Sequence, residues 1–482
     1  MKKRFFAFAS AFIVFAGTLS SGAASGSGAS YLYDTKGRSV AAPETYTAER
    51  VYDGDVMGIG HFKNPSDVFT DSRGFIYIAD TGNNRVVITD RNFRVTRIIT
   101  EISGLAPERL SAPSGVFFAS DSLLYIADTG NNRVIALDGE NRAKRRLTKE
   151  GLFAVNSQML FKPEKVAVDT DGSVYVIDKS IYQGIARYDA DGSFLGFFAP
   201  NQVEITASAF LLSLWKKILN SAQTEAMEKT LPSPYNNLYM DGEDFIYTCA
   251  ANVPVGSELK KLNAEGVNIL LTADGSQRFG DLETVVEDGL EQKNSFADIH
   301  ADENGMICAA DSNGKLFFYD NDCNLIGIAG GSGDRAGMFR TVSAVEKLGD
   351  EYLVLDADKG NLTVLAPTAY MRDVLEAMNY YNQGLYVEAS GLWQNILARN
   401  SNFAIAYRSL GRALLQQGNS KDALKMLRKG GDRYFYSIAF AEYRKEFARK
   451  YFLLIVFGSA ATVVGLVLLL KRARRWMLCE KT

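Results

Sequence analysis

Along most of the chain, short runs of β-branched and aromatic residues alternate with turns rich in Gly, Asn and Asp. Runs of this length and composition, bounded by such turns, predict β-strands. One segment, YIADTGNNRV, occurs twice in identical form, at 77–86 and at 125–134. When the chain is aligned on the Asp of this segment, the surrounding pattern recurs six times, at Asp80, Asp128, Asp178, Ala250, Asp311 and Asp356.

Most copies contain runs for four short strands, and the copies lie 45–50 residues apart where nothing is inserted. Four strands at this period are typical of a propeller blade, so six copies predict a mainly β, six-bladed propeller over 47–368. The sixth copy meets Pro367 after its third strand and therefore lacks a fourth. The strand-like run at 47–52 has no blade of its own, and we expect it to complete the sixth blade and close the ring.

The repeated DTGNNRV predicts a tight turn between the second and third strands of a blade. We expect Gly82 and Asn83 to adopt positive φ, and the Asp before the turn to accept backbone N–H groups. The Arg after the turn is expected to pair with a carboxylate. The motif resembles NHL repeats over about 64–367, most closely in the first two copies. We interpret its residues as structural, with direct ligand contact as the alternative; they are Asp80, Gly82, Asn83, Arg85, Asp128, Gly130, Asn131, Arg133, Asp178, Asp311 and Asp356.

Two segments interrupt the blade pattern. Residues 204–229 include ITASAFLLSLWKKILNSA, whose apolar residues share one helical face. This helix is expected to pack on the propeller, with a docking or membrane-contacting helix at the rim as the alternative. The acidic connection at 274–293 is expected to form a surface loop or a short helix.

From residue 370 the pattern changes to a helical period, and the residues of 377–393 recur in type 34 positions later. This spacing resembles a tetratricopeptide repeat and predicts about two helix pairs within 369–450, with 433–450 as a further helix. Such a short array either binds a partner protein or serves as a spacer. The residues that we expect to contact a partner are Tyr380, Trp393, Tyr407, Leu410 and Leu414.

Both ends of the chain indicate a membrane. Residues 1–24 have a basic start, an apolar run and small residues, which predict a secretory signal peptide, with an uncleaved anchor as the alternative. A short extension, 25–46, precedes the propeller. Residues 451–470 contain no charge and reach about 30 Å as a helix, enough to span a bilayer. The basic tail 471–482 is expected to be cytoplasmic, which leaves the bulk of the chain extracytoplasmic on a single span.

Charge and cysteine content exclude several classes of protein. The net charge is −3, which gives no broad attraction to nucleic acid. Cys479 lies in the predicted tail, so three cysteines, Cys249, Cys308 and Cys323, remain outside, an odd number without metal-binding spacing. We expect buried thiols there, with a Cys308–Cys323 disulfide left open.

The family resemblance raises the question of an enzyme, because NHL-like propellers include lyases and lactonases. The lyases need several His on zinc, and this chain has only two His. The calcium-dependent lactonases use carboxylates and Asn at one mouth of the channel, where innermost strands begin. The candidates for such a mouth are Asp67, Glu164, Asn236 and Asp298. Lys165 would compete with a cation there, so we assign no metal or cofactor, and Ca²⁺ remains the cation that these residues would bind.

These observations predict a membrane-anchored extracytoplasmic scaffold that binds a protein or carbohydrate partner beside a membrane complex. By resemblance, that complex is a carbohydrate uptake system. The first alternative is a lactonase-type hydrolase with a divalent metal at the channel mouth. The second is a purely structural spacer of the cell envelope.

Overall fold

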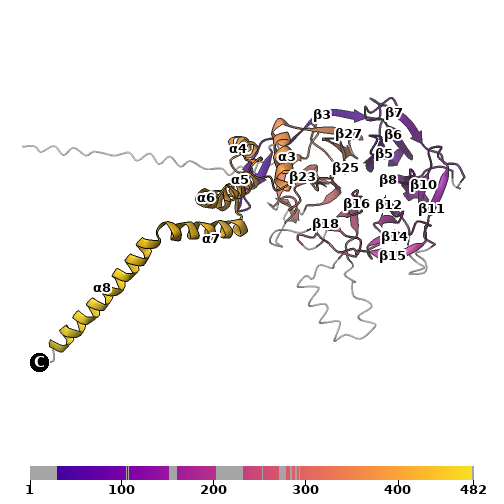
Figure 1. Ribbon diagram of the computed structural model, residues 1–482. Helices are drawn as coiled ribbons and strands as arrows, with labels where there is room; N and C mark the ends of the chain where they lie inside the picture. The colour runs from indigo at the N-terminus through magenta and orange to yellow at the C-terminus, as the bar shows by residue number, and fades with distance from the viewer. Residues whose placement is uncertain are drawn as a thin grey trace, which may run out of the picture.

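The computed structural model describes residues 30–104, 106, 108–150, 160–201, 232–251, 253, 255–270, 278–282, 285–287, 290–292 and 294–479. The predicted signal peptide and the predicted helix at 204–229 lie outside these residues. The described chain forms a ring of six antiparallel sheets, with a group of helices at one side (Figure 1). The prediction of a six-bladed propeller followed by helices is therefore confirmed.

Each blade pairs its strands in chain order, from the inner strand outward. Blade 1 contains β4 (Asp67–Thr70), β5 (Ile76–Asp80), β6 (Arg85–Thr89) and β7 (Val95–Ile99), and blade 2 contains β8 (Pro113–Phe118), β9 (Leu124–Asp128), β10 (Arg133–Leu137) and β11 (Ala143–Leu147). Blade 3 contains β12 (Pro163–Val168), β13 (Val174–Asp178), β14 (Ile185–Tyr188) and β15 (Phe194–Phe198), and blade 4 contains β16 (Tyr235–Met240), β17 (Ile246–Ala250) and β18 (Leu259–Leu262). Blade 5 contains β21 (Phe296–Ala301), β22 (Ile307–Asp311), β23 (Lys315–Tyr319) and β24 (Leu325–Gly330), and blade 6 contains β25 (Val342–Leu348), β26 (Glu351–Asp356) and β27 (Asn361–Pro367).

Blade 6 is completed by the N-terminal strand β3 (Tyr46–Asp53), as predicted. β3 pairs antiparallel with β27, with Val51 opposite Thr363. The ring of Tyr46 stacks on Phe318 at 4.5 Å between centroids and meets Tyr352 edge-on at 5.3 Å. This pairing covers the edge of β27 and gives blade 6 its fourth strand, so that the two ends of the propeller are joined in one sheet.

The second strand of a blade is buried along its whole length, because both of its faces meet a neighbouring blade. In β5, Tyr77 and Ala79 pack with residues of blade 2, whereas Ile76 and Ile78 pack with residues of blade 6. Side chains of a strand alternate between its two faces, so a continuous apolar run such as IYIA fills two interblade cores at once. This arrangement explains why the sequence lacks polar alternation at these strands.

Two connections differ from the predictions. In blade 4 the predicted fourth strand appears in the described residues only as an isolated bridge between Leu262 and Asn268. Within 274–293, predicted as a loop or short helix, the described residues form a hairpin of β19 (Val285–Glu287) and β20 (Leu290–Gln292). The segment carries Val285, Val286 and Leu290, whose apolar, partly β-branched character favours a strand despite the acidic composition. A further hairpin, β1 (Tyr31–Tyr33) and β2 (Ser39–Ala41), lies against β24.

The C-terminal part is helical: α3 (Ala369–Asn382), α4 (Ser390–Arg399), α5 (Ala404–Gln416), α6 (Ser420–Gly430), α7 (Arg433–Lys450) and α8 (Phe452–Cys479). α3 to α5 share a continuous apolar core with blades 5 and 6, to which Met371, Val374 and Trp393 contribute from the helices and Phe318 and Tyr352 from the blades. These helices therefore pack on the propeller, and only α7 and α8 extend away from it (Figure 1).

Candidate functional site

The inner strands of the six blades present equivalent positions toward the centre of the ring. The positions are equivalent because each lies opposite the same residue of the second strand in its blade, the one just before the last. The six positions are Asp67, Gly115, Lys165, Asn237, Asp298 and Ala344. The polar residues among them are buried. A charged and polar layer thus lies at the centre of the ring.

Lys165 of blade 3 reaches across blade 2 and forms an ion pair with Asp67 of blade 1. Gly115 of blade 2 allows the inner strands of blades 2 and 3 to approach closely, because a Cβ at that position would lie 2.4 Å from the carbonyl oxygen of Glu164. The second carboxylate oxygen of Asp67 accepts the backbone N–H of Val116 at 2.8 Å. Both oxygens of Asp67 therefore accept hydrogen bonds, one from blade 3 and one from blade 2.

Asp298 of blade 5 is the second carboxylate beside Lys165. Its Oδ1 accepts the N–H of Ile299 and its Oδ2 accepts the N–H of Val345, each at 2.7 Å. Burial raises the pKa of Asp298 to about 7. Burial alone would lower the pKa of Lys165, but the carboxylates of Asp67 and Asp298 raise it above its ordinary value. The ammonium therefore keeps its proton between two carboxyl groups.

At the position just before this layer in several inner strands, polar side chains form hydrogen bonds to the adjacent blade. The hydroxyl of Ser343 donates to Pro65 O at 2.8 Å, that of Ser66 to Ser114 O at 2.8 Å, and Nδ2 of Asn236 to Phe296 O at 2.8 Å. Glu164 occupies the same level but forms an ion pair with Lys179 of its own blade at 2.6 Å. Of the four predicted channel-mouth residues, the structure brings only Asp67 and Asp298 together, with Lys165 between them.

Two residues further along the inner strands lies a layer that sequence reasoning missed. His300 and Glu346 approach at 2.9 Å, and the ring of Tyr239 lies 4.3 Å from that of His300. The signal was present in the sequence, because a strand directs every second residue to the same face. In the parts of the chain that the structure describes, no three His, Cys, Asp or Glu residues gather as a metal site.

The blade turns show a shared role for the repeated Asp. Asp80 accepts the backbone N–H of Lys63 at 2.8 Å, and Asp128 accepts that of Ser111 at 2.8 Å. In the same way, the carboxylates of Asp178, Asp311 and Asp356 accept backbone N–H groups from residues just before the inner strands. The donors are Lys162, Ser295 and Arg340, respectively. Each Asp therefore fixes the strand that leads to the centre of the ring.

The carboxylates that were predicted to pair with the Arg after each turn belong to these same Asp residues. Arg85 donates to Asp80 at 2.6 Å and Arg133 to Asp128 at 2.7 Å, with Asn83 and Asn131 donating to the same carboxylates. The prediction of positive φ at Gly82 and Asn83 is wrong, because the left-handed residue is Asn84, with φ 52°. A short 3₁₀ turn over Thr81–Asn83 shifts that conformation by one residue.

Gly82 and Gly130 are explained by close backbone contacts and not by positive φ. A Cβ on Gly82 would lie 2.7 Å from Lys63 O, and a Cβ on Gly130 would lie 2.7 Å from Ser111 O. The N–H of each glycine donates to that same carbonyl oxygen, at 2.8 Å in both cases. Close backbone approach thus accounts for these glycines.

The helical residues predicted to contact a partner divide into two groups. Trp393 and Leu410 are buried in the core that the helices share with the propeller. Tyr380, Tyr407 and Leu414 are partly exposed. Gly411 allows α5 and α6 to approach, since its Cβ would lie 2.5 Å from Leu427 Cγ. Cys249 and Cys308 are buried thiols, so the Cys308–Cys323 disulfide left open by the sequence is not formed.

Comparison with known proteins finds the repeat in one part of the chain. Residues 62–88 match the family model of the NHL repeat. No curated protein matches the chain. Similar solved structures include a catalytically inactive virginiamycin B lyase from Staphylococcus aureus, at 9% identity, covering 63% of this chain and 80% of that one with a TM-score of 0.37. The extracellular domain of a one-component system from B. thetaiotaomicron is 13% identical, covering 66% and 39%, with a TM-score of 0.37. A gluconolactonase-like protein is 14% identical, covering 68% and 94%, with a TM-score of 0.40. These likenesses concern the fold alone.

Proposed function

We propose that this NHL-repeat propeller is a membrane-anchored recognition protein that binds a protein or carbohydrate partner beside a membrane complex. The observation that favours this proposal over a lactonase-type hydrolase is the ion pair of Lys165 with Asp67 beside Asp298. A lactonase-type site needs oxygen ligands turned toward a cation, whereas here an ammonium occupies that place and the oxygens accept N–H groups from neighbouring blades. The centre of the ring thus serves to hold the blades together.

The membrane anchor in this proposal is α8. Within the described residues, Phe452–Arg474 is long and apolar enough to cross a bilayer, with a mean hydropathy of 2.7, and none of that segment is buried against the rest of the chain. α7 leads into it with Tyr436, Phe440, Tyr443 and Phe447 at helical spacing, and the rings of Phe447 and Tyr451 lie 4.7 Å apart. Aromatic residues are enriched at the level of the lipid headgroups, so this stripe supports an anchor that begins near Tyr451.

Sidedness is tested with thiol labelling in intact cells. Cys249, Cys308 and Cys323 are buried, which leaves Cys479 of the tail as a reporter, and Ser437→Cys adds one on an exposed position of α7. A membrane-impermeant maleimide is expected to label Ser437→Cys in intact cells and Cys479 only after permeabilisation. The reverse pattern would contradict an extracytoplasmic propeller. A chain ending at Lys450 is the matched control for the anchor, and we expect alkaline carbonate to extract it from membranes.

Partner binding is tested by photocrosslinking from partly exposed helical positions. A photoreactive residue at Tyr407 or Leu414 is expected to trap the same membrane protein, whereas one at the buried Trp393 is expected to trap none. Equal yields from all three positions would contradict a specific surface. In parallel, hydrolysis of sugar lactones with Ca²⁺ is measured for the wild type and for Asp298→Asn. Calcium-dependent hydrolysis lost in that variant would favour the hydrolase instead.

A further inference from the structure

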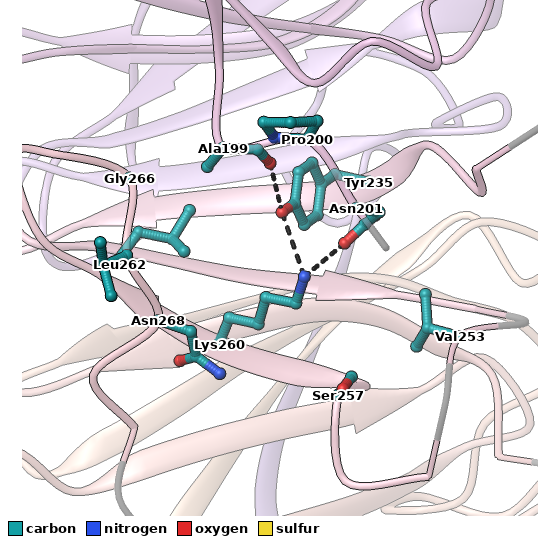
Figure 2. A pocket seen from close by; sticks show the side chains of 11 residues that line it. Ala199, Pro200, Asn201, Tyr235, Val253, Ser257, Lys260, Leu262, Gly266 and Asn268 are labelled. Atoms are coloured by element: carbon teal, nitrogen blue, oxygen red, sulfur yellow. Dashed lines mark hydrogen bonds between the residues drawn. The ribbon is translucent and has the colours of Figure 1, made fainter. Parts of the chain in front are cut away.

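A pocket of about 280 Å³ lies on the outer side of the ring, where blades 3 and 4 meet. Its floor includes Lys260 of β18, and its walls include Tyr235 of β16 and Pro200 and Asn201, which follow β15 (Figure 2). It is separate from the layers at the centre of the ring, because neither Lys165 and its carboxylates nor His300 and Glu346 line it. Ligand pockets in proteins begin at about this size, so the space suits a small molecule.

The ammonium of Lys260 is held at this pocket by two neutral acceptors. It donates to Oδ1 of Asn201 at 2.5 Å and to the hydroxyl of Tyr235 at 3.3 Å (Figure 2). The Tyr235 hydroxyl donates its own proton to Ala199 O at 2.7 Å. Burial raises the pKa of Tyr235, so this hydroxyl stays neutral and gives no counter-charge.

Among the described residues, no carboxylate forms an ion pair with Lys260, in contrast to Lys165, Lys315 and Lys347, which each have one. An ammonium has three N–H donors, and the described residues accept two of those of Lys260. Burial lowers the pKa of Lys260, which is the response of a cation without a nearby negative charge. A negatively charged group in the pocket would supply the missing charge and the third acceptor.

The other polar side chains that line the pocket are also able to donate. Oδ1 of Asn268 accepts the N–H groups of Lys261 at 3.2 Å and Leu270 at 3.1 Å, so its NH₂ is the end that remains for a ligand. Ser257 adds a hydroxyl, and Val253 and Leu262 add apolar surface. Donors around a cation, with apolar walls, favour an acceptor-rich organic anion over a bare cation or an apolar molecule.

We propose that this pocket binds a small carboxylate-bearing molecule, such as an acidic monosaccharide, whose carboxylate pairs with the ammonium of Lys260. Its hydroxyl groups meet Ser257 and Asn268. The site is independent of the partner surface and of the membrane anchor, so neither proposal depends on the other.

The test is isothermal titration calorimetry on the full-length protein in detergent. The probes are D-glucuronate, D-glucose as the neutral counterpart and inorganic phosphate as a second anion. We expect glucuronate to bind, glucose not to bind, and Lys260→Met to weaken glucuronate at least about tenfold, because removing one partner of a partly buried charge pair costs more than about 1.4 kcal/mol. Phosphate binding equal to that of glucuronate would replace the carboxylate assignment with a general anion site.

Lys261→Met is the matched control, since it removes the same charge one residue along β18. Lys261 lies over the rings of Phe245 and Tyr247, at 4.2 and 5.1 Å, and not at the pocket. No binding of either anion to the wild type would overturn the proposal, and so would equal losses in both variants. If Lys260→Met does not fold, the test is instead whether the ligand protects Lys260 from chemical modification. Glucuronate is then expected to slow acylation of Lys260, but not of Lys261, in the wild type, as measured by peptide mass spectrometry.

Discussion

The ion pair at the centre of the ring makes a strong prediction for Lys165→Met. The substitution keeps the length of the side chain but removes its charge, and it leaves Asp67 and Asp298, 7% and 4% exposed, without their cation. Breaking a buried pair by removing one partner typically costs about 3–5 kcal/mol, because the remaining charge is buried without compensation. We expect a loss of this size in the free energy of unfolding.

The control is Lys179→Met, which removes a lysine paired with Glu164 at 2.6 Å, with side chains 50% and 30% exposed. Exposed pairs contribute about 0–1 kcal/mol, so this variant is expected to lose little. Both variants are compared with the wild type by urea unfolding of the detergent-solubilised protein, followed by near-UV circular dichroism. Equal losses at Lys165 and Lys179 would refute the assignment of a buried pair.

A second readout separates lost charge from lost packing. Burial raises the pKa of both carboxyls in the folded wild type, and without the ammonium these pKa values rise further, so the folded variant binds more protons. Stability of Lys165→Met therefore rises as pH falls, and its deficit relative to the wild type is smaller at pH 5 than at pH 8. Adding Asp67→Asn to Lys165→Met is expected to restore part of the loss, and a deficit independent of pH would indicate packing alone.

Three further outcomes follow from the described contacts. Arg133→Met is expected to lose more stability in urea unfolding than Arg85→Met, because the side chain of Arg133 is fully buried beside Asp128 whereas that of Arg85 is 13% exposed. Burial raises the pKa of Asp298 in the wild type, so its contribution to stability is complete below about pH 4 and is lost as pH rises through about 7. Asp298→Asn is therefore expected to remove about 3 kcal/mol of the difference between the free energies of unfolding at pH 4 and at pH 7. Tyr46→Ala is expected to cost about 3–5 kcal/mol and to increase hydrogen exchange first in β27, since it removes the aromatic contacts of the closing strand.

The ring and its closure were predictable because each strand is visible in the local sequence pattern and the closure follows from the number of strands. A period of strands, a Pro after the third strand of the last copy and an unassigned strand near the start are visible without any contact information. The pairing of β3 with β27 follows from counting strands, although the two are about 310 residues apart. The match of 62–88 to the NHL repeat rests on the same local pattern.

The chemistry at the centre was less predictable, because it depends on which blades face one another. Sequence reasoning found Asp67, Asp298 and Lys165, but the ion pair of Lys165 with Asp67 joins blades 3 and 1 across blade 2, which no local pattern reveals. Asn236 carries the right atoms for a ligand, yet its amide joins two blades. Helical periodicity also could not separate Trp393 from Tyr407, since a core that the helices share with the propeller buries residues that an isolated repeat would expose.

The position of that shared core has a mechanical consequence. The seam of the ring is where β3 and β27 pair, and α3 begins directly after β27. The N–H of Thr368 donates to Thr45 O at 2.9 Å, while its hydroxyl accepts the N–H of Met371 at 3.2 Å and so caps α3. One residue thus joins the closing strand to the first helix. We therefore expect a force applied at α8 to act first on the buried apolar contacts of α3 to α5 with blades 5 and 6, and only then on the hydrogen bonds that close the ring.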